Sequence, residues 1–555
     1  MMNKKRGLIL GGVILAIVAA ALLVVFVILP NLGGKVKSES APVYSFDDPD
    51  WWDHAVFYEI FVRSYYDSNG DGIGDFNGIT QKLDYLNDGD PNTSTDLGVN
   101  ALWLMPIYPS PSYHGYDVTD YRGVNPDYGT MADFQNLVKE AHKRGIHVIL
   151  DFVINHTSDQ NPWFISAQDP TSSYRDWYIW SDTDLGYLGP WGETVWHPAS
   201  SGGFYYGIFT AQMPDLNYRN QAVTDEIDSI AKYWLTYVGV DGFRVDGARH
   251  LIEDGETQAN TPETLTWFKN FRDQFKTWKP TAMSVGEVWD ASYNSVKYIQ
   301  DGSFDLVFDF DLASAILSGV NMGSASAING HIVAENETFK GEGMATFLTN
   351  HDMERVINQL KDDPVKAGHA ATVLLTMPGT PFIYYGEEIG MQGKKPDEQL
   401  RTPMQWSAEL NGGFTSGSPW EYLAIGYKTA NVAVESEDPA SLLSLYRKLI
   451  QIRLQHTAFM DGEYIKVTTS APALYASLSR SQDELMLTVI NLKGAEIAAP
   501  RLTFFGTDLE GSYTITPLLT LDESGQEIQI ANSSFTLSST IPAGYNQIYL
   551  LTPKK

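Results

Sequence analysis

The chain has 555 residues, which is enough for one large catalytic domain and smaller accessory domains. Its formal net charge of -30 at pH 7 excludes nucleic acid as a natural partner, because a phosphate backbone would be repelled. The absence of cysteine excludes disulfides, thiolate catalysis and cysteine-bound metals. Nothing in the sequence indicates a protein partner.

The N-terminal segment predicts a membrane anchor. Residues 7–29 form an uncharged apolar run of 23 residues behind three basic ones, long enough to cross a bilayer as a helix. We expect residues 1–6 to be cytoplasmic, residues 7–29 to span the cell membrane once, and residues 30–50 to link this span to an extracellular body. A cleaved signal peptide and a secreted protein are the alternative, although such signals have apolar regions of only about 7–15 residues.

From Trp51 onward, short β-rich runs alternate with amphipathic helical stretches, the pattern of a β/α fold. Eight such runs are present, and eight is the number that closes a (β/α)8 barrel. The expected strands are 56–61, 101–105, 147–152, 242–245, 283–285, 306–308, 345–348 and 382–385. Because the active sites of these barrels lie at the carboxyl ends of the strands, functional residues should directly follow the runs.

Two regions interrupt this repeat. Residues 157–214 are rich in Pro, Trp and Tyr and far exceed the roughly 2–6 residues of an ordinary βα loop, so they predict a small domain inserted after the third strand. The barrel would then comprise residues 51–156 and 215–460. Residues 461–555 alternate β-forming residues between Gly and Asn turns, which predicts a C-terminal antiparallel β-sandwich.

Three of the expected strands lead into a carboxylic acid. Arg244 and Asp246 alternate with apolar residues in the fourth strand, and the guanidinium should lower the pKa of Asp246 and keep it ionised, as a nucleophile requires. Glu287 ends the fifth strand near Trp289, and an apolar neighbour raises a carboxyl pKa, as a general acid requires. Asp352 follows the seventh strand. A structural ion pair is the alternative for an Arg-x-Asp taken alone.

The loop after the first strand has the pattern of a calcium site. Oxygen-bearing side chains occupy positions 1, 3, 5 and 9 of the run 67–75, and a glycine occupies position 6. Position 12 is Gly78 rather than Glu, and a strand precedes the loop, so a Ca2+ site in a βα loop is expected rather than a helix-loop-helix hand. A metal-free turn is the alternative. The predicted Ca2+ ligands are Asp67, Asn69, Asp71, the Ile73 carbonyl and Asp75.

Four stretches, DFVINH, GFRVDGARH, VGEVW and FLTNHD, each after an expected strand, together resemble the signature regions of the alpha-amylase family of retaining glycoside hydrolases. The resemblance extends from Trp51 to the C-terminus. It implies an enzyme in which Asp246 is the nucleophile, Glu287 is the general acid/base, and Asp352 holds the substrate hydroxyls and distorts the sugar ring. It also implies that the pocket of the cleaved sugar is lined by Tyr116, His156, Arg244 and His351.

The motifs of this sequence resemble more than one branch of the family. MPDLN resembles neopullulanase and maltogenic-type members, whereas DSNGDGIGD and RTPMQW at 401–406 resemble oligo-1,6-glucosidases. Exo-acting glucosidases of the family usually carry Asp where this chain has Tyr113, and 1,6-specific members have Val where it has Gly247. Both departures favour a membrane-anchored extracellular alpha-amylase that cleaves alpha-1,4 bonds of starch or maltodextrins.

Other functions stay open at this point. An exo-acting alpha-glucosidase or oligo-1,6-glucosidase, or a transglycosidase that passes the sugar to another sugar, would use the same residues. Membrane-anchored relatives of amylases also serve as non-catalytic heavy chains of amino-acid transporters, but those resemble one another in a membrane-proximal Cys that this chain lacks. The resemblance further implies a second calcium at Asn155 and the His250 carbonyl, with no identified partners in the inserted domain.

Overall fold

The computed structural model describes residues 47–520, 525–538 and 540–554. The predicted span at 7–29 and most of the predicted linker lie outside these residues. Within the described ranges, no helix is both long and apolar enough to cross a membrane.

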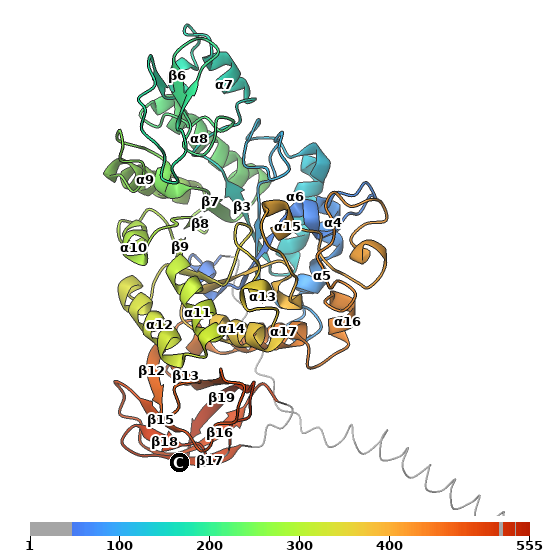
Figure 1. Cartoon of the computed structure of the whole chain (residues 1–555), viewed down its shortest axis with the longest axis vertical. Coiled ribbons are helices and arrows are strands. Elements are labelled where there is room, and N and C mark those ends of the chain that lie inside the picture. Colours follow the sequence, from blue (N-terminus) through green and yellow to red (C-terminus); the bar gives the residue numbers. More distant parts are fainter. Residues whose placement is uncertain (1–46, 521–524, 539, 555) are drawn as a thin grey trace, which may run out of the picture. The chain divides into compact units, whose positions relative to one another are not determined.

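Eight parallel strands close into a barrel in the order β1-β11-β10-β9-β8-β7-β3-β2, so each strand pairs with the barrel strands before and after it in the chain, and the first pairs with the last. Figure 1 labels β3, β7, β8 and β9 of this barrel. The predicted (β/α)8 barrel is confirmed, and every expected strand matches an observed one to within two residues at either end. The strands are β1 Phe57–Ile60, β2 Ala101–Leu104, β3 His147–Phe152, β7 Gly242–Val245, β8 Met283–Gly286, β9 Leu306–Phe308, β10 Met344–Phe347 and β11 Thr380–Tyr384.

Helices cover the outside of the barrel, so the strands are buried on both faces. Their starts follow from the sequence: Thr130 and Asp133 form a capping box on α6, and Asp363 caps α14 ahead of a proline. The covering helices are α3 Val62–Tyr65, α4 Phe76–Gln81, α5 Leu83–Leu86, α6 Met131–Lys143, α8 Gln221–Lys232, α9 Pro262–Trp278, α10 Ser292–Gln300, α11 Phe310–Met322, α12 Ala325–Phe339, α13 Val356–Gln359, α14 Pro364–Thr376 and α17 Leu442–Gln455.

Short helical turns join these elements. The π-helical turn η5 Tyr233–Val238 continues α8, and α15 Asp397–Leu400 and α16 Val432–Ser436 lie in the long connection between β11 and α17. The remaining turns are η2 Trp51–His54, η3 Pro126–Tyr128, η4 Arg175–Trp177, η6 Ala248–His250, η7 Glu387–Ile389, η8 Leu410–Gly413 and η9 Thr457–Phe459.

Aromatic side chains fill the inside of the barrel. Phe57 of β1 stacks on Phe382 of β11 with ring centroids 4.2 Å apart, and Phe308 of β9 meets Phe382 edge-on at 4.9 Å. Trp103 of β2 completes this contact with Phe308 at 5.5 Å. The barrel is therefore a packed core that holds the strand ends in fixed positions rather than an open channel.

The segment between β3 and α8 folds around a core of its own. It contains α7 Pro162–Ala167 and a three-stranded antiparallel sheet in the order β4-β6-β5. Its strands are β4 Trp180–Ser181, β5 Trp196–Pro198 and β6 Phe204–Tyr206. The buried residues Val195, Trp196, Tyr206 and Ile208 form its small apolar cluster. All these elements lie within residues 157–214, the range predicted for the inserted domain.

The C-terminal region is antiparallel, as predicted. Its eight strands follow the order β17-β16-β19-β14-β13-β12-β15-β18. The first half of β12 pairs with β13 and the second half pairs with β15, and apolar residues from both ends of the order share one core cluster. The strands are β12 Glu463–Thr469, β13 Leu474–Arg480, β14 Leu485–Asn491, β15 Arg501–Phe504, β16 Gly511–Pro517, β17 Gln526–Ile530, β18 Ser534–Thr536 and β19 Asn546–Pro553.

Removing one ring from the barrel interior should destabilise the fold strongly. Phe308→Ala leaves a cavity among four aromatic neighbours, and we expect a loss of about 3–5 kcal/mol and a clearly lower midpoint in denaturant unfolding. The matched control is Phe505→Ala, which truncates a phenylalanine that is 50% exposed and should change the free energy of unfolding by less than about 0.5 kcal/mol. Equal midpoints for the two variants would contradict this description of the core.

Candidate active site

Arg244, at the centre of β7, connects carboxylates from three barrel strands. Its Nη1 donates to Asp151 Oδ1 of β3 and to Asp246 Oδ1, in each case at 2.8 Å, and its Nη2 donates to Glu287 Oε2 at 2.6 Å. The guanidinium is fully buried, whereas the side chains of Asp246 and Glu287 keep 14% and 11% of their surface exposed. One rigid, planar cation therefore fixes two accessible carboxylates beside each other at the carboxyl ends of adjacent strands.

A second chain of contacts links Tyr116, His351 and Asp352. The Tyr116 hydroxyl donates to Asp151 Oδ2 at 3.0 Å and lies 2.7 Å from Nε2 of His351, whose ring stacks on the tyrosine. His351 Nε2 is also 3.2 Å from Asp352 Oδ2, and Arg401 donates to Asp352 Oδ1 at 2.7 Å. The side chain of Asp352 is 30% exposed, so it is the most accessible of the three predicted catalytic carboxylates.

Burial affects Asp246 and Glu287 to different extents. Burial raises the pKa of Glu287 to about 7, despite the opposing effect of Arg244, and the Asp246 carboxylate adds to this rise. Burial also raises the pKa of Asp246, to about 6, although Arg244 lowers it. The expected contact with Arg244 is present, but the expected net lowering of the Asp246 pKa is wrong because desolvation outweighs one ion pair. Asp246 still releases its proton before Glu287 does.

Asp352 stays ionised over the whole neutral range. Burial alone would raise its pKa, but His351 and Arg401 hold it well below the usual value. Burial alone would lower the pKa of His351, but the carboxylates of Asp352 and Glu59 raise it to about 10. The charge near Asp352 is thus fixed, while the protons of Asp246 and Glu287 are exchangeable near pH 7.

The backbone after Asp246 is shaped for this arrangement. Gly247 has φ of +52°, a left-handed conformation that favours glycine, and its N–H donates to Glu287 Oε2 at 3.1 Å. A Cβ atom at Gly247 would lie 2.9 Å from Cζ of Phe209, which belongs to the inserted domain. The glycine therefore permits both the hydrogen bond to the acid and the close approach of the neighbouring domain.

His156, the remaining predicted pocket residue, is buried behind Tyr116. Its Nε2 lies 3.0 Å from the Tyr116 carbonyl oxygen, and its ring meets Phe209 edge-on at 5.2 Å. Burial lowers the pKa of His156 to about 4, so the ring is neutral. The preceding residue, Asn155, donates to Asp215 Oδ2 at 3.1 Å.

Three residues of this network were not predicted from the sequence as site residues. Glu59, in the buried strand β1, lies 2.5 Å from Nδ1 of His351, on the side opposite Asp352. Asp151 accepts a hydrogen bond from Arg244. Arg401 donates to the His351 carbonyl oxygen and to the Asp352 side chain. Glu59 and Asp151 could have been found from the sequence, because each is an acidic residue inside a largely apolar strand, and a buried charge requires a buried partner. No local signal links Arg401 to Asp352.

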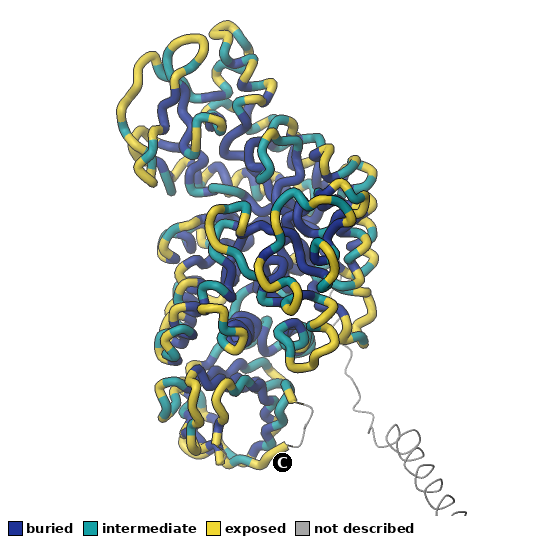
Figure 2. Tube along the Cα trace, turned by 45° about the vertical axis from the view of Figure 1, so that its right-hand side comes forward, coloured by how far each residue is buried: buried dark blue, intermediate teal, exposed yellow. Residues whose placement is uncertain are grey.

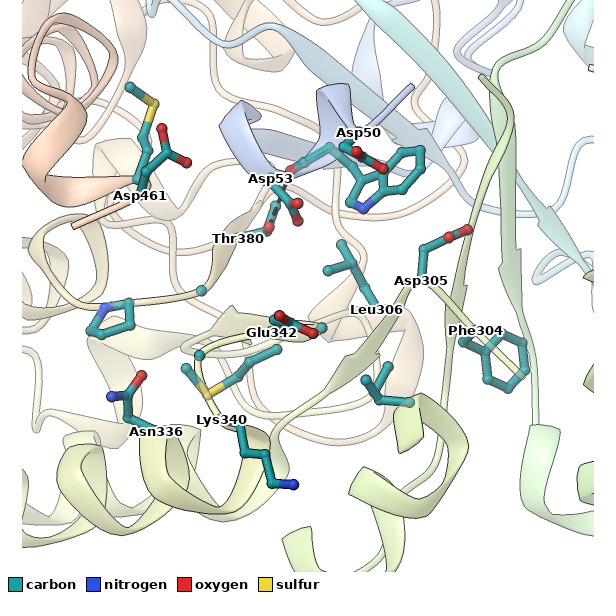
Figure 3. Close-up of a pocket in the computed structure, with 18 of the residues that line it drawn as sticks. Asp50, Asp53, Phe304, Asp305, Leu306, Asn336, Lys340, Glu342, Thr380 and Asp461 are labelled. Atoms are coloured by element: carbon teal, nitrogen blue, oxygen red, sulfur yellow. Dashed lines mark hydrogen bonds between the residues drawn. The ribbon is translucent and has the colours of Figure 1, made fainter. Parts of the chain in front are cut away.

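A separate cavity of about 840 Å³ lies at the other end of the barrel (Figure 3). Its lining includes the first residues of β9, β10 and β11, so it is at the amino ends of the strands, whereas the carboxylates described above follow the carboxyl ends. Asp53, Asp305 and Glu342 line it from different elements. Because catalysis in such barrels takes place at the carboxyl ends, this cavity is not the active site.

The predicted calcium loop is held together by its own hydrogen bonds. Asp67 accepts from the backbone of Asn69, Gly70 and Gly72, and Asp75 Oδ1 accepts from the backbone of Gly78 at 2.7 Å. In the described ranges, no group of three or more His, Asp or Glu side chains is placed to hold a metal ion. The loop residues therefore do not form such a group in this arrangement, and both calcium sites stay predictions.

Comparison with known proteins identifies the family. The model of the alpha-amylase catalytic domain matches residues 59–462, which is more than half of the chain. The chain belongs to the alpha-amylase family. Alpha-amylase 3 of Dictyoglomus thermophilum is 39% identical over 462 residues, covering 82% of this chain and 87% of that protein. An oligo-1,6-glucosidase of Parageobacillus thermoglucosidasius is 33% identical over 80% of this chain and 90% of its own length.

Solved structures of the alpha-amylase family agree with this fold. The crystal structure of an alpha-amylase from H. orenii has a TM-score of 0.80 and 42% identity, covering 90% of this chain and all of the other. An isomaltulose synthase of Erwinia rhapontici NX5 has a TM-score of 0.77 and 29% identity over 91% of this chain and 99% of its own. An alpha-amylase and an isomaltulose synthase thus share this architecture, and the chain is a glycoside hydrolase family member with an enzymatic fold.

The Glu59 contact predicts a measurable change in the charge of His351. In Glu59→Gln, the amide keeps the shape but loses the negative charge, so the pKa of His351 should fall by about 1–3 units. Histidine-selective 13C labelling and NMR titration would follow this value. The control is Glu387→Gln, since Glu387 is a buried glutamate that bonds Tyr446 instead of the histidine. An unchanged His351 titration in Glu59→Gln would show that Asp352 alone sets the charge.

Chelation tests the calcium prediction directly. An ion that binds only the folded chain stabilises it by about 2.7 kcal/mol at 100 times its Kd, so removal of calcium should lower the melting temperature by several degrees. Asp71→Asn, which removes one charge from an exposed loop position, should reduce this response to the chelator. An unchanged melting curve when a chelator is added to protein equilibrated with excess calcium would contradict the site.

Proposed function

We propose that the chain is a retaining alpha-amylase that cleaves alpha-1,4 bonds of starch and maltodextrins. The observation that carries this proposal is that one buried guanidinium bonds both Asp246 and Glu287, while their pKa values differ in the order that a nucleophile and an acid require. Retaining glycosidases need two carboxyl groups only about 5 Å apart, on either side of the scissile bond. Two acids bonded to the same guanidinium suit that requirement.

The proposed reaction has two displacements. In the first, Asp246 attacks the anomeric carbon while protonated Glu287 gives its proton to the glycosidic oxygen, which releases the leaving chain and forms a glycosyl ester on Asp246. In the second, Glu287 takes a proton from water, the water oxygen attacks the anomeric carbon, and Asp246 is released with the original configuration restored at the sugar. Asp352, held by Arg401, would accept hydrogen bonds from the sugar hydroxyls.

The surroundings of Tyr113 and Gly247 support the choice of alpha-1,4 bonds and internal cleavage. Tyr113 stacks on Trp420 at 5.4 Å, and the Arg401 guanidinium lies 5.9 Å from its ring, so an aromatic wall stands where an acidic residue would grip a terminal sugar. Valine at position 247 would clash with Phe209 and would have to adopt a positive φ. An exo-acting glucosidase and a transglycosidase are the alternatives, since proteins named oligo-1,6-glucosidase, trehalose synthase/amylase and isomaltulose synthase are similar to this chain.

We also propose that residues 7–29 anchor the enzyme in the cell membrane, with the catalytic barrel outside. The support is the sequence alone: an uncharged run of 23 residues follows three basic ones, which favours a cytoplasmic N-terminus. Protease accessibility of the barrel on intact cells, together with retention of the protein in washed membranes, would test both parts of this proposal.

The pH profile of the activity should be narrow and bell-shaped. The enzyme needs Asp246 ionised and Glu287 protonated, so kcat/KM should fall below a pKa of about 6 and fall again above a pKa of about 7. Each limb should approach a tenfold loss per pH unit. Initial rates on a soluble maltodextrin between pH 4 and 9 provide the measurement, with folding checked by circular dichroism at each pH. A flat profile from pH 5 to pH 8 would rule out this assignment of protons.

The products identify the reaction. A time course on soluble starch, with anomeric detection, should give mixed oligosaccharides of alpha configuration from the start, and Asp246→Asn and Glu287→Gln should each lower kcat by several orders of magnitude while retaining the melting temperature. Glucose as the sole early product would instead establish an exo-acting enzyme. Products longer than a maltotriose substrate would establish a transglycosidase.

A further inference from the structure

Trp191 exposes a large aromatic surface on the inserted domain. Its side chain is 59% exposed, in a stretch whose residues are mostly open to solvent (Figure 2). The indole is at the tip of a closed turn, because Leu188 bridges Thr194 and the Gly189 N–H donates to the Glu193 carbonyl at 2.8 Å. The turn thus has its own backbone hydrogen bonds, which present the ring in a defined place.

This ring continues an aromatic surface that starts at the catalytic residues. Trp191 stacks on Phe209 with centroids 5.6 Å apart and an interplanar angle of 26°, and it meets His250 edge-on at 5.4 Å. Phe209 in turn lies against Gly247, next to the predicted nucleophile, and against His156. The surface therefore extends from the site of bond cleavage outward to Trp191. None of the aromatic rings that form it carries a charge.

We propose that the exposed face of Trp191 is a binding subsite for one glucosyl unit of an alpha-glucan chain. This proposal rests on the proposed function. A glucosyl ring presents a face of C–H groups that packs on an indole, while its hydroxyl groups stay at the edge and remain hydrated. A large exposed ring adjacent to a functional site is the kind of apolar surface that marks a ligand contact. The subsite would extend the cleft by way of the inserted domain.

The subsite belongs to the leaving part of the substrate. Phe209 lies against Gly247, and the Gly247 N–H bonds Glu287, the group that would protonate the departing oxygen. A glucan that runs from this oxygen along Phe209 would reach Trp191 only if it has further units beyond the cleaved bond. Long maltodextrins should therefore gain from Trp191 more than short ones do.

Substrate length provides the test. In Trp191→Ala, the ratio of kcat/KM for maltoheptaose to kcat/KM for maltotriose should fall about threefold to tenfold, the range expected for one lost stacking partner. Trp191→Tyr keeps a flat ring and should restore most of the ratio. The matched control is Phe505→Ala, which removes an exposed aromatic residue next to β15 of the C-terminal sheet and should leave the ratio unchanged.

Binding provides a second readout that does not need turnover. In the Glu287→Gln background, calorimetric titration with maltoheptaose should show a similar loss of affinity when Trp191→Ala is added. An unchanged length ratio and unchanged affinity, in a variant with the wild-type melting temperature, would overturn the subsite. A wild-type chain that does not cleave starch internally would instead overturn the proposed function, and the two failures are distinguished by assaying the wild type first.

Discussion

The buried charge of Arg244 is the constraint on which the rest of the site depends. A guanidinium in the centre of a barrel is costly unless carboxylates compensate it, and Asp151, Asp246 and Glu287 do so from three strands. The same contacts orient the two accessible acids. Because the guanidinium is planar and always charged, it acts as a fixed template for the acids rather than as a group that exchanges protons.

Around this template, burial rather than pairing decides where the exchangeable protons are. Desolvation raises the pKa values of Glu287 and Asp246 toward neutral pH, whereas His351 and Arg401 keep Asp352 ionised. One site therefore combines a fixed negative charge with two acids that can exchange a proton near pH 7. This division needs the packed barrel behind it, since a solvated site would return all three acids to similar pKa values.

The inserted domain is part of the site as well as an accessory to it. Phe209 occupies the space that any side chain at position 247 would need, and it also contacts His156. Phe209 thus packs against the backbone that bonds Glu287. The sequence pattern indicated the domain and the glycine separately, but their contact is a property of the folded chain only.

The sequence by itself determined the barrel, its eight strands and the family, because hydrophobic periodicity and the four motifs are local signals. It also indicated Arg244 as the neighbour of Asp246, since residues two apart in a strand share a face. Only the tertiary structure decided the partners of Glu59 and Arg401, which are about 290 and 50 residues distant from the His351–Asp352 pair. It also decided the net pKa of Asp246, because desolvation depends on everything packed around a group and is not encoded in its neighbours along the chain.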